Sequence, residues 1–515
     1  MNNALPAEHL PGRKTAYAIL FLQGLGNLFP WNSFITAAHY FSMRLCGSPF
    51  QNSFENYLSV TTMLSQCLGL WVSVRYLQHL PLKCCVLVSI LISTLVMIGT
   101  SVLVVTEVSQ MFLFNITVLS CCLIGLCSAT SGGGLFGLSG CLPPSYTGAL
   151  MSGQALGGLV VSLFSMLTIW LGGRSNSFCN LPVNIHGKDE CPMSIDYGAL
   201  SFFVIACVIL CLCLLSFVGL FVLPFTKFHE GRVEKDRLRC DSIDDIQPSE
   251  VEAHSEERVA AALLRGCSLD DIQEVSAANP VFDCEQNGGT ELTPLNSSRK
   301  DHTVSYNGDN NSSSGTVKRQ YERSDTVSVS ARERQLRIFR KIRPAALAVF
   351  GTFLCTLSLF PSLTVKITSQ YRCQTNSTLF DNDLFVPSLF VLFNVSDFMG
   401  RMLAGVSRLG VSSDNIWVPV VLRFLFVPLF LFCRVMDSQL PLIFESDAWP
   451  LVFMVLFGLS NGFLSTVGMM IGPQMVSPRK APLAGTIMML SLNLGLLFGA
   501  ACSFPIVQIS LGTLY

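Results

Sequence analysis

Charged residues are scarce in this sequence: Asp, Glu, Lys and Arg make up 13% of its 515 residues, and the formal net charge is −1. Soluble domains carry about 25% charged residues, so the composition excludes an ordinary soluble protein. A net charge this small gives the chain no overall basic character, and we expect no nucleic acid partner. Half of the residues are hydrophobic, and they form runs of about twenty, the length of a helix that crosses a bilayer.

The motifs of common enzymes and channels are also missing. No Cys and His residues have zinc spacing, and no phosphate-binding glycine loop or nucleophile elbow occurs. There is no channel filter, no arginine-repeat voltage sensor and no ATP-binding motif. We therefore expect no enzyme activity, no metal and no cofactor. Most of the 20 cysteines lie inside apolar runs, where they are interpreted as small packing residues.

The apolar runs predict an all-α polytopic membrane protein with about eleven transmembrane helices. A six-helix bundle is expected over residues 1–223, a disordered cytoplasmic loop over 224–343, and a five-helix bundle over 344–515. The first run is too long for the core of a cleavable signal peptide. Two bundles joined by a long loop are typical of alternating-access transporters. The expected helices begin near Lys14, Tyr57, Cys84, Met111, Tyr146, Ala199, Pro344, Leu384, Trp417, Pro450 and Ala484.

Lysines and arginines near the span ends predict a cytoplasmic N-terminus and an external C-terminus. Both flanks of the long loop, TKFHEGRVEKDRLR and RERQLRIFRKIR, then lie on the cytoplasmic side. The sequon at Asn376 falls outside, where it is a glycosylation candidate. Four cysteines also fall outside, as disulfides or as free thiols: Cys46, Cys179, Cys191 and Cys373.

The long loop is polar, with few aromatic residues, which predicts disorder. It contains SIDDIQ at 242–247 and SLDDIQ at 268–273. The repeat is either a duplicated segment without a fold or a pair of docking motifs for kinases or trafficking proteins.

A carboxylate and a guanidinium stand four residues apart in the apolar segment FNVSDFMGRML. Asp397 and Arg401 therefore share one face of the eighth expected span, and Asn394 lies one turn earlier on that face. One interpretation is an ion pair that locks helix packing. The other is a site for a polar solute with vicinal hydroxyls, since the carboxylate accepts and the guanidinium donates hydrogen bonds.

Other polar or aromatic residues inside the spans are candidates for a cavity or a gate. In the first span, Pro30 is expected to break or kink the helix. Trp31 beside it can stack on a planar ring or anchor the helix at the membrane interface. The remaining candidates are Asn32, Gln154, Arg423 and Asn461.

These residues stand in segments that resemble the equilibrative nucleoside transporters. In family order the segments are GLGNLFPWNSFITA, GLFGLSGCLPPSYTGALMSGQALGG, FNVSDFMGR, LRFLFVPLFLFC and FGLSNGFLSTVGMMIGPQMVSP. The resemblance covers nearly all of the membrane portion. It implies a major-facilitator-like fold with one helix fewer, which moves nucleosides, and in some members nucleobases, down their gradients without ATP.

The resemblance also implies roles for individual residues. Asp397 and Arg401 match the family's ribose-binding acid and its arginine partner, Trp31 matches the aromatic residue near the base, and Leu28 and Ile35 match neighbouring cavity positions. Three positions depart from the family. Gly132 replaces a base-contacting glutamine, Ser128 replaces a glycine linked to thioinosine inhibitors, and Pro482 replaces a glutamate ahead of the last span.

Two alternatives to nucleoside transport stay open. The first is organic-cation, monoamine or proton-linked transport by the same family, although the acid that the cation branch uses corresponds to the neutral Gln154. The second is a membrane scaffold that works through its cytoplasmic loop. The expected partners are a nucleoside and the lipid bilayer, and the expected location is the plasma membrane, with a lysosomal or endosomal membrane as the alternative.

Overall fold

The computed structural model describes residues 11–46, 48, 54–76, 82–171, 197–229, 231, 331–371, 382–406 and 410–512. These residues form helices and turns, with two isolated β-bridges and no strand among them. The first half contains α1 (Arg13–Thr36), α2 (Ala38–Arg44), α3 (Phe54–Tyr76), α4 (Leu82–Val105), α5 (Gln110–Gly140), α6 (Pro144–Leu171) and α7 (Tyr197–Leu220). The second half contains α11 (Ala331–Leu359), η4 (Thr364–Lys366), α12 (Asn382–Val406), α13 (Trp417–Leu422), η5 (Arg423–Leu425), α14 (Phe426–Leu431), α15 (Ala448–Ile471), η6 (Gly472–Met475) and α16 (Ala481–Leu511).

A helix lies at every position where the sequence predicts a span, so the all-α prediction is confirmed. Nine of the described helices are long and apolar enough to cross a membrane. Helix α1 has 24 residues but includes the polar Gln23, Asn27 and Asn32. The ninth predicted span consists of α13, η5 and α14, which together form a shorter apolar segment, Trp417–Leu431.

Prolines act differently in two of these helices. Helix α1 continues through Pro30 to Thr36, so of the predicted break or kink the break does not occur, and the kink stays a prediction. A proline removes one backbone hydrogen bond, and membrane helices tolerate that loss where neighbouring helices cover the freed carbonyl. In the ninth span the backbone tightens to a 3-10 turn at η5. Pro428 cannot donate to the carbonyl of Phe424 four residues earlier, and this accounts for the interruption.

Helix α11 begins at Ala331, thirteen residues before the expected start at Pro344, and residues 331–343 are helical rather than part of a disordered loop. The segment is rich in arginine and resembles a loop by average polarity. However, Ile338 and Ile342 lie four residues apart and are buried, which is the period of a helix docked by one face. Residues 232–330, which include both SIDDIQ-type motifs, lie outside the described residues.

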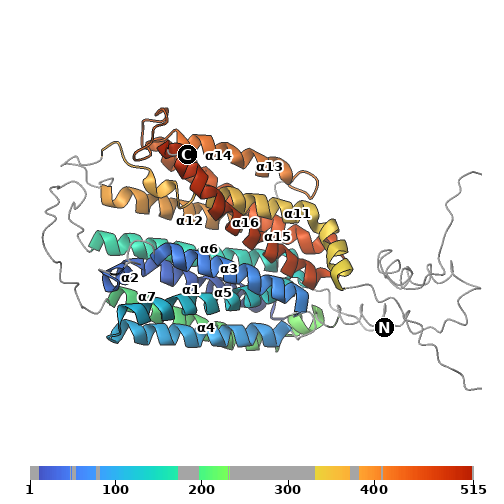
Figure 1. The fold of residues 1–515 in the computed structure, drawn as a ribbon. Coiled ribbons are helices and arrows are strands. Elements are labelled where there is room, and N and C mark those ends of the chain that lie inside the picture. The colour runs from blue at the N-terminus through green and yellow to red at the C-terminus, as the bar shows by residue number, and fades with distance from the viewer. Residues whose placement is uncertain are drawn as a thin grey trace, which may run out of the picture. The chain divides into compact units, whose positions relative to one another are not determined.

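The described helices of both halves belong to one compact unit. In Figure 1 the helices α1–α7, blue to green, lie together, as do α11–α16, yellow to red. Within the first half, α1 packs on α6 and α7, and α5 packs on α3 and α4. Within the second half, α11 packs on α15 and α16, and α12 packs on α15. The halves meet mainly where α6 contacts α12 and where α5 and α3 contact α16.

Candidate functional site

The carboxylate of Asp397 and the guanidinium of Arg401 meet one turn apart on α12. Arg401 Nε donates to Asp397 Oδ2 at 2.9 Å, as their spacing predicts. The two residues are buried, with exposed fractions of 4% and 6%. An unpaired charge in a bilayer is costly, and this pairing offsets part of the cost within a single helix.

The second oxygen of Asp397 accepts a hydrogen bond from another helix. Asn461 Nδ2 on α15 donates to Asp397 Oδ1 at 2.6 Å. The amide oxygen of Asn461 lies 2.7 Å from the hydroxyl of Thr356 on α11, and Arg423 Nη2 donates to that hydroxyl at 2.9 Å. Arg423, Thr356, Asn461, Asp397 and Arg401 thus form one chain of contacts through four elements, η5, α11, α15 and α12. We call these five residues the polar network.

Arg423 lies at the end of the polar network and is 2% exposed. Its Nη1 donates to the Phe457 carbonyl at 2.9 Å and also bonds the Ser460 hydroxyl. The guanidinium carbon lies 4.7 Å from the centroid of the Phe457 ring. Among the described residues, its Nε has no hydrogen-bond partner. The network holds two guanidinium groups and one carboxylate, and the carbonyl, hydroxyl and ring of α15 stabilise the excess positive charge.

Thr356 is the residue on which the polar network's continuity depends. We expect Thr356→Val to lower the stability of the purified protein by about 1–3 kcal/mol, because Arg423 Nη2 and Asn461 Oδ1 then lose a buried partner. The matched control is Thr352→Val, since among the described residues the Thr352 hydroxyl bonds only the Ala348 carbonyl of its own helix. Thermal unfolding in detergent measures both. Equal loss in the two variants would show that the network adds no stability.

Arg401 also joins the two halves of the molecule. Its Nη1 donates to the carbonyl oxygen of Met151 on α6 at 2.9 Å. Small residues line this contact between α6 and α12, since a Cβ added to Gly148 would lie 3.7 Å from the Cα of Gly405. The ion pair therefore lies at the boundary between the halves rather than in the interior of one bundle.

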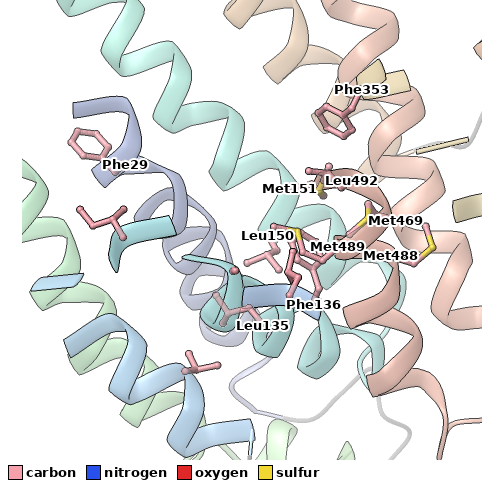
Figure 2. Close-up of a cluster of buried hydrophobic side chains, with 14 of the residues drawn as sticks. Phe29, Leu135, Phe136, Leu150, Met151, Phe353, Met469, Met488, Met489 and Leu492 are labelled. Atoms are coloured by element: carbon pink, nitrogen blue, oxygen red, sulfur yellow. The ribbon is translucent and has the colours of Figure 1, made fainter. Parts of the chain in front are cut away.

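Apolar side chains of both halves pack together at this boundary, close to the Arg401–Met151 contact, as Figure 2 shows. Buried residues from both halves meet there, namely Phe136, Leu150 and Met151 from the first half and Met469 and Met489 from the second. Thr486 on α16 also donates to the Gly133 carbonyl on α5 at 3.0 Å. The halves are thus in contact on the side where α6 and α16 begin and where α5 and α12 end.

The predicted α1 residues lie outside the polar network. Trp31, Leu28 and Asn32 are half-buried, and Ile35 is 50% exposed. Helix α6 contacts both α1 and α12. Two adjacent glycines of α6 lie close to asparagines of these helices. A Cβ at Gly157 would lie 3.5 Å from Leu25 Cδ1 and 3.6 Å from Asn32 Nδ2, and a Cβ at Gly158 would lie 2.5 Å from Asn394 Oδ1.

Asn394 and Gln154 are also separate from the polar network. Asn394 is half-buried, and its Nδ2 donates to the Phe390 carbonyl of its own helix at 2.9 Å. Gln154 is 4% exposed and lies where α6 crosses α1, close to Gly24. Of the predicted polar candidates, the structure therefore brings together Asp397, Arg401, Arg423 and Asn461.

A small polar pocket lies inside the first half, around Asn27 of α1. Ser131 of α5 donates to Asn27 Oδ1 at 2.8 Å, and the Ser128 hydroxyl lies 3.1 Å from the Asn27 carbonyl oxygen and 3.4 Å from Oδ1. Among the described residues Asn27 Nδ2 has no partner, and the pocket of about 10 Å³ has room for about one water molecule. Gly132 is adjacent, and a Cβ there would lie 3.2 Å from Asn27 Nδ2 and 3.1 Å from Met489 Cε.

Sequence reasoning missed Thr356, the Met151 carbonyl and the Asn27 pocket. Thr356 lies in GTFLCTLSLF, where nothing in the local pattern marks it as different from Thr352. Asn27, in LQGLGNLFP, did carry a signal, because a polar amide in the middle of a span needs a partner.

The cysteines of the described residues are free thiols except for Cys46, which is disulfide-bonded. The other three cysteines predicted to lie outside, and the sequon at Asn376, fall beyond the described residues. No group of three or more metal-binding side chains occurs within the described ranges.

The sequence pattern of the family described as "Nucleoside transporter" matches residues 118–268 and 282–508. Equilibrative nucleoside transporter 1 of Homo sapiens is 28% identical, over 95% of this chain and 96% of that protein. Equilibrative nucleoside transporter 2 of Rattus norvegicus is 30% identical, over 94% of this chain and 95% of that protein. Among solved structures, the major facilitator superfamily proton:xylose symporter XylE has a TM-score of 0.53 at 9% identity, over 96% of this chain and 88% of that one.

Proposed function

This chain belongs to the nucleoside transporter family, and from that membership we propose that it carries nucleosides down their concentration gradients, with Asp397 and Arg401 as the ribose-binding pair. The major facilitator fold of the similar structure supports a carrier with two moving halves. The observation that carries the proposed site is the position of the ion pair. It is a charged group at the boundary between the halves, and one of its hydrogen bonds crosses that boundary.

Ribose chemistry suits this pair. Each of two vicinal hydroxyls can donate one hydrogen bond and accept another. One hydroxyl donates to the Asp397 carboxylate while the other accepts from the Arg401 guanidinium, and both bonds are charge-assisted. Trp31 on α1 offers an aromatic face to the base, and Leu28 offers an apolar surface beside it.

Substrate binding and the contact between the halves compete for Arg401. In this structure Arg401 Nη1 donates to the Met151 carbonyl, and a ribose hydroxyl that accepts the same N–H replaces that bond. The α6–α12 contact is then weakened, and the halves can separate on that side. One charge-assisted hydrogen bond is exchanged for another of similar net value, about 1.5–3 kcal/mol. The substrate is therefore not bound so tightly that it cannot dissociate. A carrier without an energy source requires such weak binding.

The orientation and the location are part of the proposal. A cytoplasmic N-terminus places Cys46, which follows α1 and α2, on the external side, and its disulfide supports that placement because disulfides persist in oxidising compartments. The closed side of the molecule then faces the cytoplasm. The chain is a multi-pass membrane protein. We propose the plasma membrane as its location, with a lysosomal or endosomal membrane as the alternative.

The competing functions have less support. Cation transport by an acid in α6 does not fit the neutral, buried Gln154. Proton-linked transport by a relay needs a chain of titratable groups, and the polar network holds a single carboxylate. A scaffold has no need for buried charges. A variant without the cytoplasmic loop that still transports would exclude the scaffold.

The test is uptake of radiolabelled uridine and adenosine by cells that express the chain. We expect saturable uptake that stops when internal and external concentrations are equal, at both mildly acidic and neutral external pH. Accumulation above the external concentration at acidic pH would instead show proton coupling. Uptake no higher than in cells without the protein, with the protein present at the surface, would contradict the nucleoside assignment.

A further inference from the structure

The N-terminal part of α11, residues 331–343, is a strongly basic helix outside the apolar stretch. We call it the α11 basic segment. Its sequence ARERQLRIFRKIR contains six basic residues and one acidic residue, a net charge of +5. The helix is continuous through Pro344 into its apolar part. In Figure 1 this yellow end of α11 turns away from the axis of the rest of the helix, as a proline inside a helix allows.

One face of the α11 basic segment is docked and the opposite face is open. Ile338 and Ile342 are 3% and 0% exposed and hold the segment against the protein. The exposed face carries arginines together with apolar side chains, since Leu336 is 45% exposed and Phe339 is 36% exposed. The exposed basic residues are Arg334, Arg337, Arg340, Lys341 and Arg343.

The segment directly precedes the apolar part of α11, in the same continuous helix. Arg343 immediately precedes the apolar stretch, and Arg340 and Arg337 follow at about one and two turns further out, or roughly 5 and 10 Å along the helix. Guanidinium groups bind phosphate oxygens with paired hydrogen bonds. Exposed leucine and phenylalanine beside such groups favour the boundary between headgroups and acyl chains.

We propose that the α11 basic segment binds anionic phospholipids of the cytoplasmic leaflet. The inference rests on the cytoplasmic N-terminus proposed above and is independent of the transported solute. Clusters of basic residues next to a membrane helix on the cytoplasmic side attract anionic lipids. The open face also carries Leu336 and Phe339, whose side chains can contact acyl chains. A face that only contacted water would not need these apolar side chains.

A bound lipid would act on the contact between the halves. Gln335 Nε2, in the same segment, donates to the Val74 carbonyl at the end of α3 at 2.7 Å. This hydrogen bond joins the second half to the first on the closed side. Lipid that holds the segment at the membrane surface therefore stabilises the closed contact.

The test compares lipid retention by the full-length protein in nanodiscs of phosphatidylcholine, with and without phosphatidylserine. Native mass spectrometry counts the phosphatidylserine molecules that remain bound. We expect the triple variant Arg337→Gln/Arg340→Gln/Arg343→Gln to lose most of the retained phosphatidylserine. The matched control, Arg13→Gln/Lys14→Gln/Lys227→Gln, removes three exposed basic residues from the same side and should keep it. Equal loss in both variants would overturn the proposal, because any cytoplasmic charge would then suffice.

Two further measurements keep the proposal falsifiable if the triple variant folds poorly. Replacement of the same three arginines by lysine preserves the charge but not the paired hydrogen bonds, so retention should lie between that of the unaltered protein and that of the glutamine variant. In the unaltered protein, hydrogen exchange of residues 331–343 should slow when phosphatidylserine is present, and high salt should reverse the effect. Unchanged exchange would contradict the proposal. Because neither measurement uses nucleoside uptake, failure of the proposed transport activity would be recognised separately.

Discussion

Asp397→Asn should reduce uridine uptake to the level of cells without the protein, whereas Asp414→Asn should leave uptake unchanged. Both changes replace a carboxylate by an amide of the same shape, but Asp414 is exposed and Asp397 is 4% exposed. Asp397 accepts from two donors, Arg401 Nε and Asn461 Nδ2. An amide has one acceptor oxygen, so one donor then faces an NH₂ group and Arg401 is left as a buried cation. The loss of one partner of a buried ion pair costs about 3–5 kcal/mol.

Loss of uptake in the single variant would not by itself separate substrate binding from folding, and a double variant does. Asp397→Asn/Arg401→Gln removes both charges of the pair, so Arg401 is no longer left as a buried cation, and Arg423 keeps its bonds to the Phe457 carbonyl and the Ser460 hydroxyl. We expect the double variant to regain much of the thermal stability and surface level that Asp397→Asn loses, and still to show no saturable uptake. Recovery of uptake together with stability would contradict the proposed ribose site. The pair would then be a lock for helix packing.

The sequence predicts the ion pair because both partners lie on one helix. An i, i+4 spacing places Asp397 and Arg401 on the same face whatever surrounds that helix. The rest of the polar network connects residues that are distant in the chain, with Asn461 and Thr356 separated by 105 positions and Arg423 and Thr356 by 67. Such contacts depend on which helix faces meet, and the apolar pattern of a span contains little information about that.

The span positions are predicted well because bilayer thickness fixes helix length and apolar composition. The same reasoning fails where polarity and periodicity disagree. Residues 331–343 are polar on average, but Ile338 and Ile342 dock a helix there. Similarly, Pro30 taken by itself favours a break in the helix. However, α1 is continuous through Pro30, because its packed neighbours hold the helix together. Local sequence therefore predicts where a span begins less well than where its apolar part lies.

Gly462→Ala should displace the polar network as a whole and abolish uptake. A Cβ at Gly462 would lie well under 3.0 Å from the Asp397 carbonyl oxygen and 3.0 Å from the Arg401 backbone nitrogen. Helices α12 and α15 cross at this point, and Gly458 is also confined, with a Cβ 2.6 Å from the Phe393 carbonyl oxygen. Because the obstruction is backbone, no side chain can rotate away, and α15 must shift together with Asn461. Overpacking of this kind costs about 1–3 kcal/mol.

Gly405→Ala provides the matched control for this crossing. It changes the same residue type on α12, and nothing lies within 4 Å of its added Cβ. Alanine favours a helix over glycine by about 1 kcal/mol, so this variant should be as stable as the unaltered protein or more stable. Thermal unfolding and uridine uptake, measured on both variants, separate the contribution of close helix contact from that of helix propensity. If Gly462→Ala matches Gly405→Ala in both measurements, the crossing tolerates a wider separation, and the position of Asp397 does not depend on it.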